Sequence, residues 1–126
     1  MTDIYLHEAL YRGRPAIEKL GQASITLCGA GALGSLLADN LARQGLRRLT
    51  IIDFDRMEQH NAGTQLYAES DVGAKKVDLL RSHLFRSVGA EVSVFDRRLD
   101  ERTIKKFLRA PNWSSTPLTM PPLAAW

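Results

Sequence analysis

A short apolar strand that runs directly into three spaced glycines constrains this chain more than any other feature. The run Ile25-Thr-Leu-Cys-Gly-Ala-Gly-Ala-Leu-Gly-Ser35 places Gly29, Gly31 and Gly34 in the pattern Gly-x-Gly-x-x-Gly, and a helical pattern follows at once. In such a turn Gly29 allows the tight bend, Gly31 lets a phosphate approach the backbone, and Gly34 lets the helix lie close to the strand. The free N–H groups at the start of the helix then face the phosphates. The pattern therefore predicts a nucleotide-binding turn.

Strands and helices alternate along the first 110 residues. The predicted strands are residues 24–28, 48–53 and 91–95, with helices beginning near residue 32, before residue 77 and near residue 100. Two short helices, separated near Pro15, are expected before the first strand. The order βαβαβα predicts an α/β fold, a Rossmann-like, doubly wound parallel sheet that ends after about three strands.

Periodicity predicts which side chains form the core. The first helix after the glycines has an apolar stripe at helical spacing, formed by Leu33, Leu36, Leu37 and Leu41. The next helix has a second stripe, formed by Val77, Leu80, Leu84 and Val88. Residues 48–53 are continuous and β-branched, as expected of a central strand covered on both faces. Cys28 ends the first strand, where a buried small hydrophobic residue is expected rather than a catalytic thiol.

Composition excludes several classes of protein. The 126 residues suit one domain, and no apolar run reaches the length of about 18 residues that a membrane span needs. The N-terminus does not resemble a signal peptide, so a cytoplasmic protein without membrane contact is expected. The net charge is only +3. The basic residues of 97–109 lie among acids, which favours a solvated helix over a nucleic-acid site. A single cysteine excludes an internal disulfide and a four-cysteine zinc site, and we assign no residue as a metal ligand.

Residues 111–126 differ in character from the rest of the chain. They hold four prolines and no period, so they cannot form the fourth strand that the fold calls for. We therefore divide the chain into a nucleotide-binding region, 1–110, and an irregular tail, 111–126. Two hypotheses stay open for the tail: an irregular terminus, or a frameshift near Ala110, since codons exist whose displaced frame encodes an apolar strand and an acidic turn. Sequencing the coding DNA decides between them.

Asp53 limits the choice of nucleotide. It stands at the end of the second predicted strand, 19 residues after Gly34. A carboxylate there can accept hydrogen bonds from both ribose hydroxyls of NAD or of ATP. The glycines and Asp53 together indicate an adenosine nucleotide and leave both cofactors open.

The polar residues after Asp53 favour ATP through a family resemblance. They are Asp55, Asn61, Gln65, Gly73 and Lys76. Together with the glycines they are in register with the pattern Gly-x-Gly-x-x-Gly, Asp-x-Asp, Asn-x-x-Arg-Gln and Gly-x-x-Lys. Across residues 5–109 the chain thus resembles the ubiquitin-activating-enzyme-like adenylyltransferases, the ThiF, MoeB and HesA group.

The resemblance implies ATP-dependent adenylation of a carboxylate, usually the C-terminal glycine of a ubiquitin-like or sulfur-carrier protein. It implies that Asp53 holds the ribose, that Lys76 contacts the triphosphate and that Asn61 donates hydrogen bonds to phosphate oxygens. Asp55 and Gln65 are further candidates for nucleotide contact, although a turn role for Asp55 and a solvated role for Gln65 stay open. Mg²⁺ bridging the phosphates and a homodimer are also expected.

Two departures from the family pattern affect the expected activity. Thr64 stands where the family has the arginine of Asn-x-x-Arg-Gln, and Tyr5-Leu-His7 stands where it often has Tyr-x-Arg. The downstream aspartate that organises magnesium and any thioester-forming cysteine are also absent from the sequence. We therefore expect this chain by itself to be inactive.

Two alternative functions remain. An NAD(P)-binding Rossmann module would bind NADH tightly without magnesium. A non-catalytic relative would bind a partner protein and would not exchange pyrophosphate into ATP.

Overall fold

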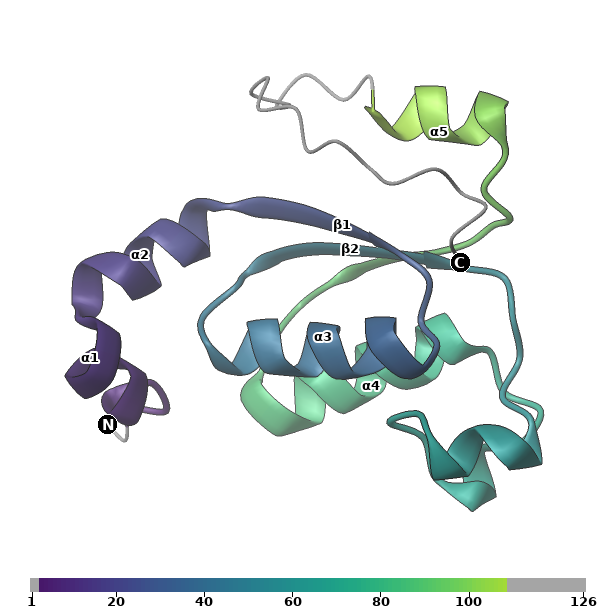
Figure 1. The fold of residues 1–126 in the computed structure, drawn as a ribbon, viewed down its shortest axis with the longest axis horizontal. Coiled ribbons are helices and arrows are strands. Elements are labelled where there is room, and N and C mark those ends of the chain that lie inside the picture. Colours follow the sequence, from purple (N-terminus) through teal and green to yellow (C-terminus); the bar gives the residue numbers. More distant parts are fainter. Residues whose placement is uncertain (1–2, 109–126) are drawn as a thin grey trace.

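A three-stranded parallel sheet with helices between its strands forms the core of the protein (Figure 1). The computed structural model describes residues 3–108, and of residues 107 and 108 only the backbone. The elements are α1 (Leu6–Arg12), α2 (Arg14–Gln22), β1 (Ser24–Cys28), α3 (Ala32–Arg43), β2 (Arg48–Asp53), the 3-10 turns η1 (Gln59–Gly63) and η2 (Glu69–Asp71), α4 (Lys76–Val88), β3 (Ser93–Asp96) and α5 (Glu101–Leu108). The predictions for residues 111–126 lie outside the described residues.

The strand order β1-β2-β3 confirms the predicted parallel α/β architecture. Cys28 pairs with Ile52, and Ile52 pairs with Phe95, so the carboxyl ends of the strands meet at one edge. The bounds of β1 and β2 agree with the prediction. β3 begins two residues later than predicted, because its pairing with β2 starts only at Ser93.

The predicted apolar stripe of α3 packs against the core only at Leu41, and the prediction is wrong for the other three leucines. Leu33, Leu36 and Leu37 are 65%, 45% and 40% exposed, and the helix instead buries its small residues, Ser35, Ala38 and Ala42. The cause is the close approach at the start of the helix. Gly34 lies so near the backbone of Gly29 that no Cβ fits there, and a helix held this close packs through small side chains.

The predicted face of α4 is confirmed, since Val77, Leu80 and Leu84 are buried and Val88 packs against them. α5 begins at Glu101, which agrees with the predicted start near residue 100. The Asp100 carboxylate accepts hydrogen bonds from the backbone N–H groups of Arg102 (2.9 Å) and Thr103 (2.8 Å), which is an N-cap.

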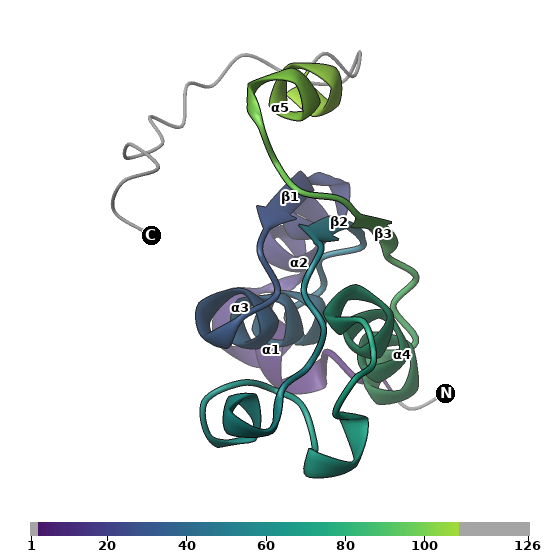
Figure 2. The same ribbon diagram turned by 90° about the vertical axis from the view of Figure 1, so that its right-hand side faces the viewer.

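The two faces of the sheet differ in how they are covered. α3 and α4 lie together on one face, and α5 lies on the other side of the sheet (Figure 2). Leu49 and Ile51 of β2 pack in the helix-covered core, while Ile52 is also buried, as predicted for a central strand. Cys28 was expected to be buried and is exposed, because alternation along β1 turns it away from the core that Ile25 and Leu27 join.

The chain before the sheet forms the predicted pair of short helices. Gly13, at φ 85°, separates α1 from α2, and Pro15 lies in the first turn of α2. Within residues 3–108, none of the helices combines the length and the apolar character needed to cross a bilayer.

Candidate nucleotide-binding site

Three glycines shape the turn between β1 and α3, and each meets a different constraint. Gly29 has φ +117°, a conformation that favours glycine, and its N–H donates to the Ile52 carbonyl at 2.8 Å. A Cβ on Gly34 would overlap the carbonyl oxygen of Gly29 and lie 2.8 Å from its carbonyl carbon. A Cβ on Gly31 would meet only Gln65 Nε2, at 4.0 Å. The backbone is therefore open to a ligand at Gly31, and at Gly34 it is packed.

Asp53 and Tyr67 hold the peptide groups of this turn on both sides of Ala30. The Asp53 carboxylate accepts hydrogen bonds from the Ala30 N–H (2.6 Å) and the Asp55 N–H (2.8 Å). The Tyr67 hydroxyl donates to the Ala30 carbonyl at 2.6 Å. Burial of the ring, together with the nearby Asp53 charge, raises the pKa of Tyr67 far above its ordinary value, so the hydroxyl stays a donor. The two carboxylate oxygens offer about four lone-pair sites, so Asp53 can accept further hydrogen bonds.

Lys76 brings a buried positive charge to the same edge of the sheet. Its side chain is only 7% exposed, and its Nζ lies 3.8 Å from Asp55 Oδ2. The Lys76 N–H donates to the Asp55 carbonyl at 3.1 Å, so the two residues also meet through the backbone. A buried ammonium without a close counter-charge carries a desolvation cost, which an anion in the site would relieve.

The loop between β2 and α4 carries Asn61 and Gln65, and Gln65 lies beside the turn. Asn61 is buried, and its Oδ1 accepts the Glu58 N–H at 2.9 Å, closing a capping box around η1. The Asn61 Nδ2 group donates to no residue in the described part of the chain. Gln65 Oε1 is a buried acceptor without a hydrogen-bond partner there. Both carboxamides thus keep unused hydrogen-bonding groups, and that of Gln65 lies near Gly31.

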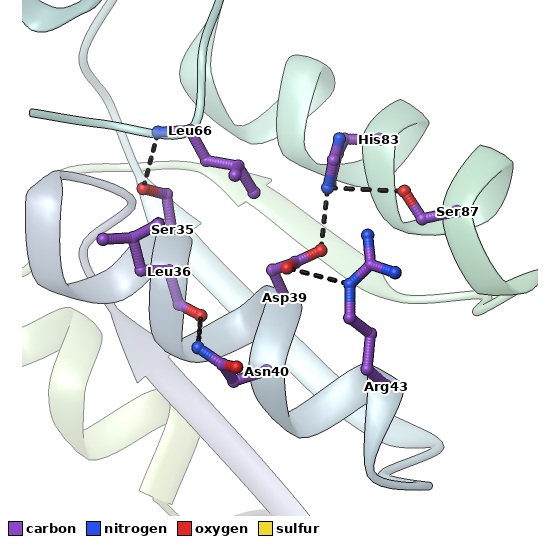
Figure 3. A network of polar contacts seen from close by, with 8 residues as sticks. All are labelled: Ser35, Leu36, Asp39, Asn40, Arg43, Leu66, His83 and Ser87. Carbon is purple, nitrogen blue, oxygen red and sulfur yellow. Dashed lines mark hydrogen bonds and ion pairs between the residues drawn. The ribbon is translucent and has the colours of Figure 1, made fainter. Parts of the chain in front are cut away.

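A polar network joins α3, which follows the glycine turn, to α4, which begins with Lys76 (Figure 3). Asp39 accepts from Arg43 Nε at 3.0 Å and lies 2.8 Å from His83 Nε2, while Ser87 Oγ is 3.4 Å from the same nitrogen. Serine and aspartate share one ring nitrogen, so His83 cannot relay a proton between them as in a hydrolase triad. The side chain of His83 is 27% exposed and connects the two helices.

This network predicts a pH dependence of stability. Burial alone would raise the pKa of Asp39, but hydrogen bonds from Arg43 and His83 outweigh it and the pKa is lowered. A carboxylate with a lowered folded-state pKa adds stability above its unfolded pKa, about 3.9, which is lost as the pH falls through the folded value. Below about pH 5 the unfolding free energy of the unmodified chain should decline. In Asp39→Asn we expect this decline to be smaller by about 1 kcal/mol.

Urea unfolding between pH 3 and pH 7 measures this effect. Asp78→Asn is the matched control, because Asp78 pairs with Arg81 at the surface, with both side chains more than half exposed. Equal pH profiles for Asp39→Asn and the unmodified chain would contradict the prediction.

The structure brings most of the predicted site residues together. A continuous set of contacts runs from the glycine turn through Asp53 and Asp55 to Lys76. Two residues of the site, Tyr67 and Ser35, were not predicted from the sequence. Ser35, fully buried, accepts the Leu66 N–H at 3.2 Å and fixes the loop to α3. Tyr67 is the only tyrosine between β2 and α4, which was its one sequence signal.

Three features of these residues fit ATP. They are the open backbone at Gly31, the unpartnered Gln65 Oε1 and the buried ammonium of Lys76. In residues 3–108 no three His, Cys, Asp or Glu side chains converge on a possible metal position. Any Mg²⁺ would therefore depend mainly on phosphate oxygens and water, as Mg²⁺ commonly does.

Comparisons with known proteins agree with this geometry. The profile of the ThiF family matches residues 6–113. The chain is 35% identical over 92 residues to the NEDD8-activating enzyme E1 catalytic subunit of Caenorhabditis elegans, covering 71% of this chain and 21% of that protein. It is 42% identical over 67 residues to the adenylyltransferase and sulfurtransferase MOCS3 of Aedes aegypti, covering 52% of this chain and 15% of that protein.

Among solved structures, the chain is similar to the tRNA threonylcarbamoyladenosine dehydratase of E. coli, solved in complex with ATP. The TM-score is 0.76 at 25% identity, over 81% of this chain and 43% of that chain. The chain thus spans less than half of the length of each of these relatives.

Proposed function

This chain belongs to the ThiF family, and on that premise we propose that it binds ATP at the turn between Gly29 and Gly34. The nucleotide would present its α-phosphate to the carboxylate of an acceptor, which becomes an acyl-adenylate. The acceptor we propose is the C-terminal carboxylate of a ubiquitin-like or sulfur-carrier protein. The names of the two curated relatives above support this class of acceptor.

One observation carries the proposal: Ala30, Asp53, Asp55 and Lys76 form an unbroken set of contacts. It joins the open glycine turn to a carboxylate at one end of the site and a buried cation at the other. A nucleoside triphosphate has the same order of groups, with ribose hydroxyls at one end and anionic phosphates at the other. An adenosine with a single phosphate would leave the buried cation unmatched.

The proposed chemistry is an in-line displacement at the α-phosphorus. An acceptor carboxylate oxygen forms a bond to phosphorus, the bond to the bridging oxygen breaks, and pyrophosphate leaves with the electron pair. Asp53 would hold the ribose, and Lys76 and the Asn61 amide would stabilise charge on the phosphates. Asp55 would hold the backbone of Lys76 through its carbonyl, and Gln65 would cover the turn. Mg²⁺, when bound, supplies charge neutralisation between the phosphates.

The two departures from the family pattern lead us to propose binding without turnover by this chain alone. Thr64 and His7 replace arginines that would otherwise stabilise the developing phosphate charge. ATP–pyrophosphate exchange measures this directly. Exchange by the purified chain would contradict this part of the proposal and would show that the two arginines are dispensable.

Asp53→Ala tests the nucleotide site. Losing a carboxylate that accepts ribose hydroxyls should weaken ATP binding by about tenfold to a hundredfold, since a hydrogen bond to a charged group contributes about 1.5–3 kcal/mol. The measurement is ATP titration by calorimetry, with and without Mg²⁺, on samples shown to be folded.

Tyr67→Phe is the control for that experiment, because it removes the other hydrogen bond to Ala30 and leaves the carboxylate in place. We expect it to lower stability by about 1 kcal/mol and ATP affinity very little. Equal loss of ATP affinity in both variants would mean that Asp53 acts only by shaping the turn. Tight NADH binding without magnesium would instead favour the dinucleotide-binding alternative.

We also propose that the chain forms a homodimer, as expected from the family. Within residues 3–108 the outer edge of β1 pairs with no other strand, and an unpaired edge favours association. Light scattering of the purified chain tests this, and a monodisperse monomer would contradict it.

A further inference from the structure

Lys75, the residue directly before Lys76, forms a short ion pair with the last residue of β3. Its Nζ lies 2.6 Å from Asp96 Oδ2, and each side chain is 38% exposed. Asp96 stands beside Asp53 in the register of β2 and β3. The pair therefore ties the residue that precedes α4 to the carboxyl edge of the sheet, next to the proposed ribose site.

Within residues 3–108, the Lys76 ammonium makes a long ion pair with Asp55 and no side-chain hydrogen bond. The 3.8 Å between its Nζ and Asp55 Oδ2 exceeds hydrogen-bond length. Its backbone does the positioning, through the Lys76 N–H to the Asp55 carbonyl at 3.1 Å and the Met57 N–H to the Ala74 carbonyl at 2.8 Å. These bonds join two segments that meet at the antiparallel bridge between Arg56 and Lys75. Whatever holds Lys75 therefore also holds Lys76.

The charges around Asp96 keep Lys75 engaged. The hydrogen bond from Lys75 lowers the pKa of Asp96, and the nearby charges of Lys75, Arg56 and Arg97 act in the same direction. Asp96 is therefore a carboxylate at neutral pH and neutralises Lys75. Of the two adjacent lysines, Lys75 has a counter-ion at 2.6 Å, whereas the counter-ion of Lys76, Asp55, is 3.8 Å away.

We propose that the ion pair between Lys75 and Asp96 is a positioning device that sets Lys76 for the triphosphate, while neither Lys75 nor Asp96 touches the nucleotide. This inference rests on the proposed ATP site. Exposed ion pairs contribute little to global stability, about 0–1 kcal/mol in general. The effect of the pair should therefore appear in nucleotide binding more than in folding.

Asp96→Asn and Lys75→Met test the proposal by calorimetric titration with ATP and with AMP. We expect each variant to bind ATP about fivefold more weakly and AMP with unchanged affinity, because AMP lacks the phosphates that Lys76 would reach. The double variant should bind ATP no more weakly than either single variant, since both remove the same interaction. Asp96→Glu, which keeps the charge, should restore binding. Asp78→Asn removes an equal charge from the first turn of α4 and should leave both affinities unchanged.

Hydrogen exchange of the nucleotide-free protein gives an independent readout. The Lys76 amide should exchange faster in Asp96→Asn and Lys75→Met than in the unmodified chain, while the amide of Leu84, later in α4, should not change. Unchanged ATP affinity in Asp96→Asn would overturn the proposal, and so would tighter binding, which would identify Lys75 as a direct phosphate ligand. If the unmodified chain does not bind ATP, the proposed function fails, and exchange of the Lys76 amide still decides the positioning role.

Discussion

Replacing Gly34 with alanine should prevent this protein from folding. The added methyl group would overlap the carbonyl oxygen of Gly29 and lie 2.8 Å from its carbonyl carbon. Neither atom can move away easily, because the Gly29 N–H is hydrogen-bonded to Ile52 and the turn is fixed to Asp53 through Ala30. Relief requires α3 to withdraw from the sheet, which opens the contact made by Ser35, Ala38 and Ala42.

We expect the free energy of unfolding to fall by more than about 4 kcal/mol. That is a large part of the total of about 5–15 kcal/mol that is typical of a domain. Circular dichroism and thermal unfolding measure it. Gly63→Ala is the matched control, since a Cβ there meets nothing within 4 Å and Gly63 has no positive φ; its effect should stay within about 0.5 kcal/mol. A folded Gly34→Ala protein that melts within a few degrees of the unmodified chain would contradict the close-approach role.

Replacing Lys76 with methionine should change stability and binding in opposite directions. In the free protein the ammonium is buried with its counter-ion 3.8 Å away, so its desolvation is poorly offset. Methionine has a similar shape and no charge, and Asp55, which is half exposed, can be hydrated when its partner is gone. We expect the unfolding free energy to rise by about 1 kcal/mol, at the low end of what replacing buried ion pairs yields.

ATP binding should weaken by about tenfold to a hundredfold in the same variant, because a charge-assisted contact to phosphate is lost. Urea unfolding measures the unfolding free energy, and calorimetric titration measures the ATP affinity. Lys105→Met, at an exposed position on α5, should change neither. A Lys76→Met protein that is less stable than the unmodified chain would show that the lysine serves the fold, and unchanged ATP affinity would remove it from the site.

Much of the fold could be predicted from the sequence because its signals are local. The strands 24–28 and 48–53 and the break before Pro15 follow from residue types along a short stretch. The pattern of glycines, Asp53, Asp55 and Lys76 was specific enough to indicate the family, which the family profile over residues 6–113 confirms. The same pattern predicted that the candidate residues lie at the carboxyl edge of the sheet, because the carboxyl ends of parallel strands meet at one edge.

The predictions that failed concern which side of an element is covered. Spacing shows that Leu33, Leu36 and Leu37 share a face of α3, but not that the sheet approaches the opposite face. That depends on Gly34 lying against Gly29, a contact between backbone atoms that no hydrophobic pattern records. Cys28 is a similar case, since alternation along β1 does not say which face meets the helices.

The order of residues thus determined the parallel architecture, the glycine turn and the identity of the charged groups at the site. Only the tertiary structure decided that Lys76 is buried, that Tyr67 and Asp53 hold Ala30 from two sides, and that Asp96 of β3 reaches Lys75. Local residue types set backbone conformation directly. Burial and ion pairing depend on distances between segments far apart in the chain, and those are fixed only when helices and strands pack.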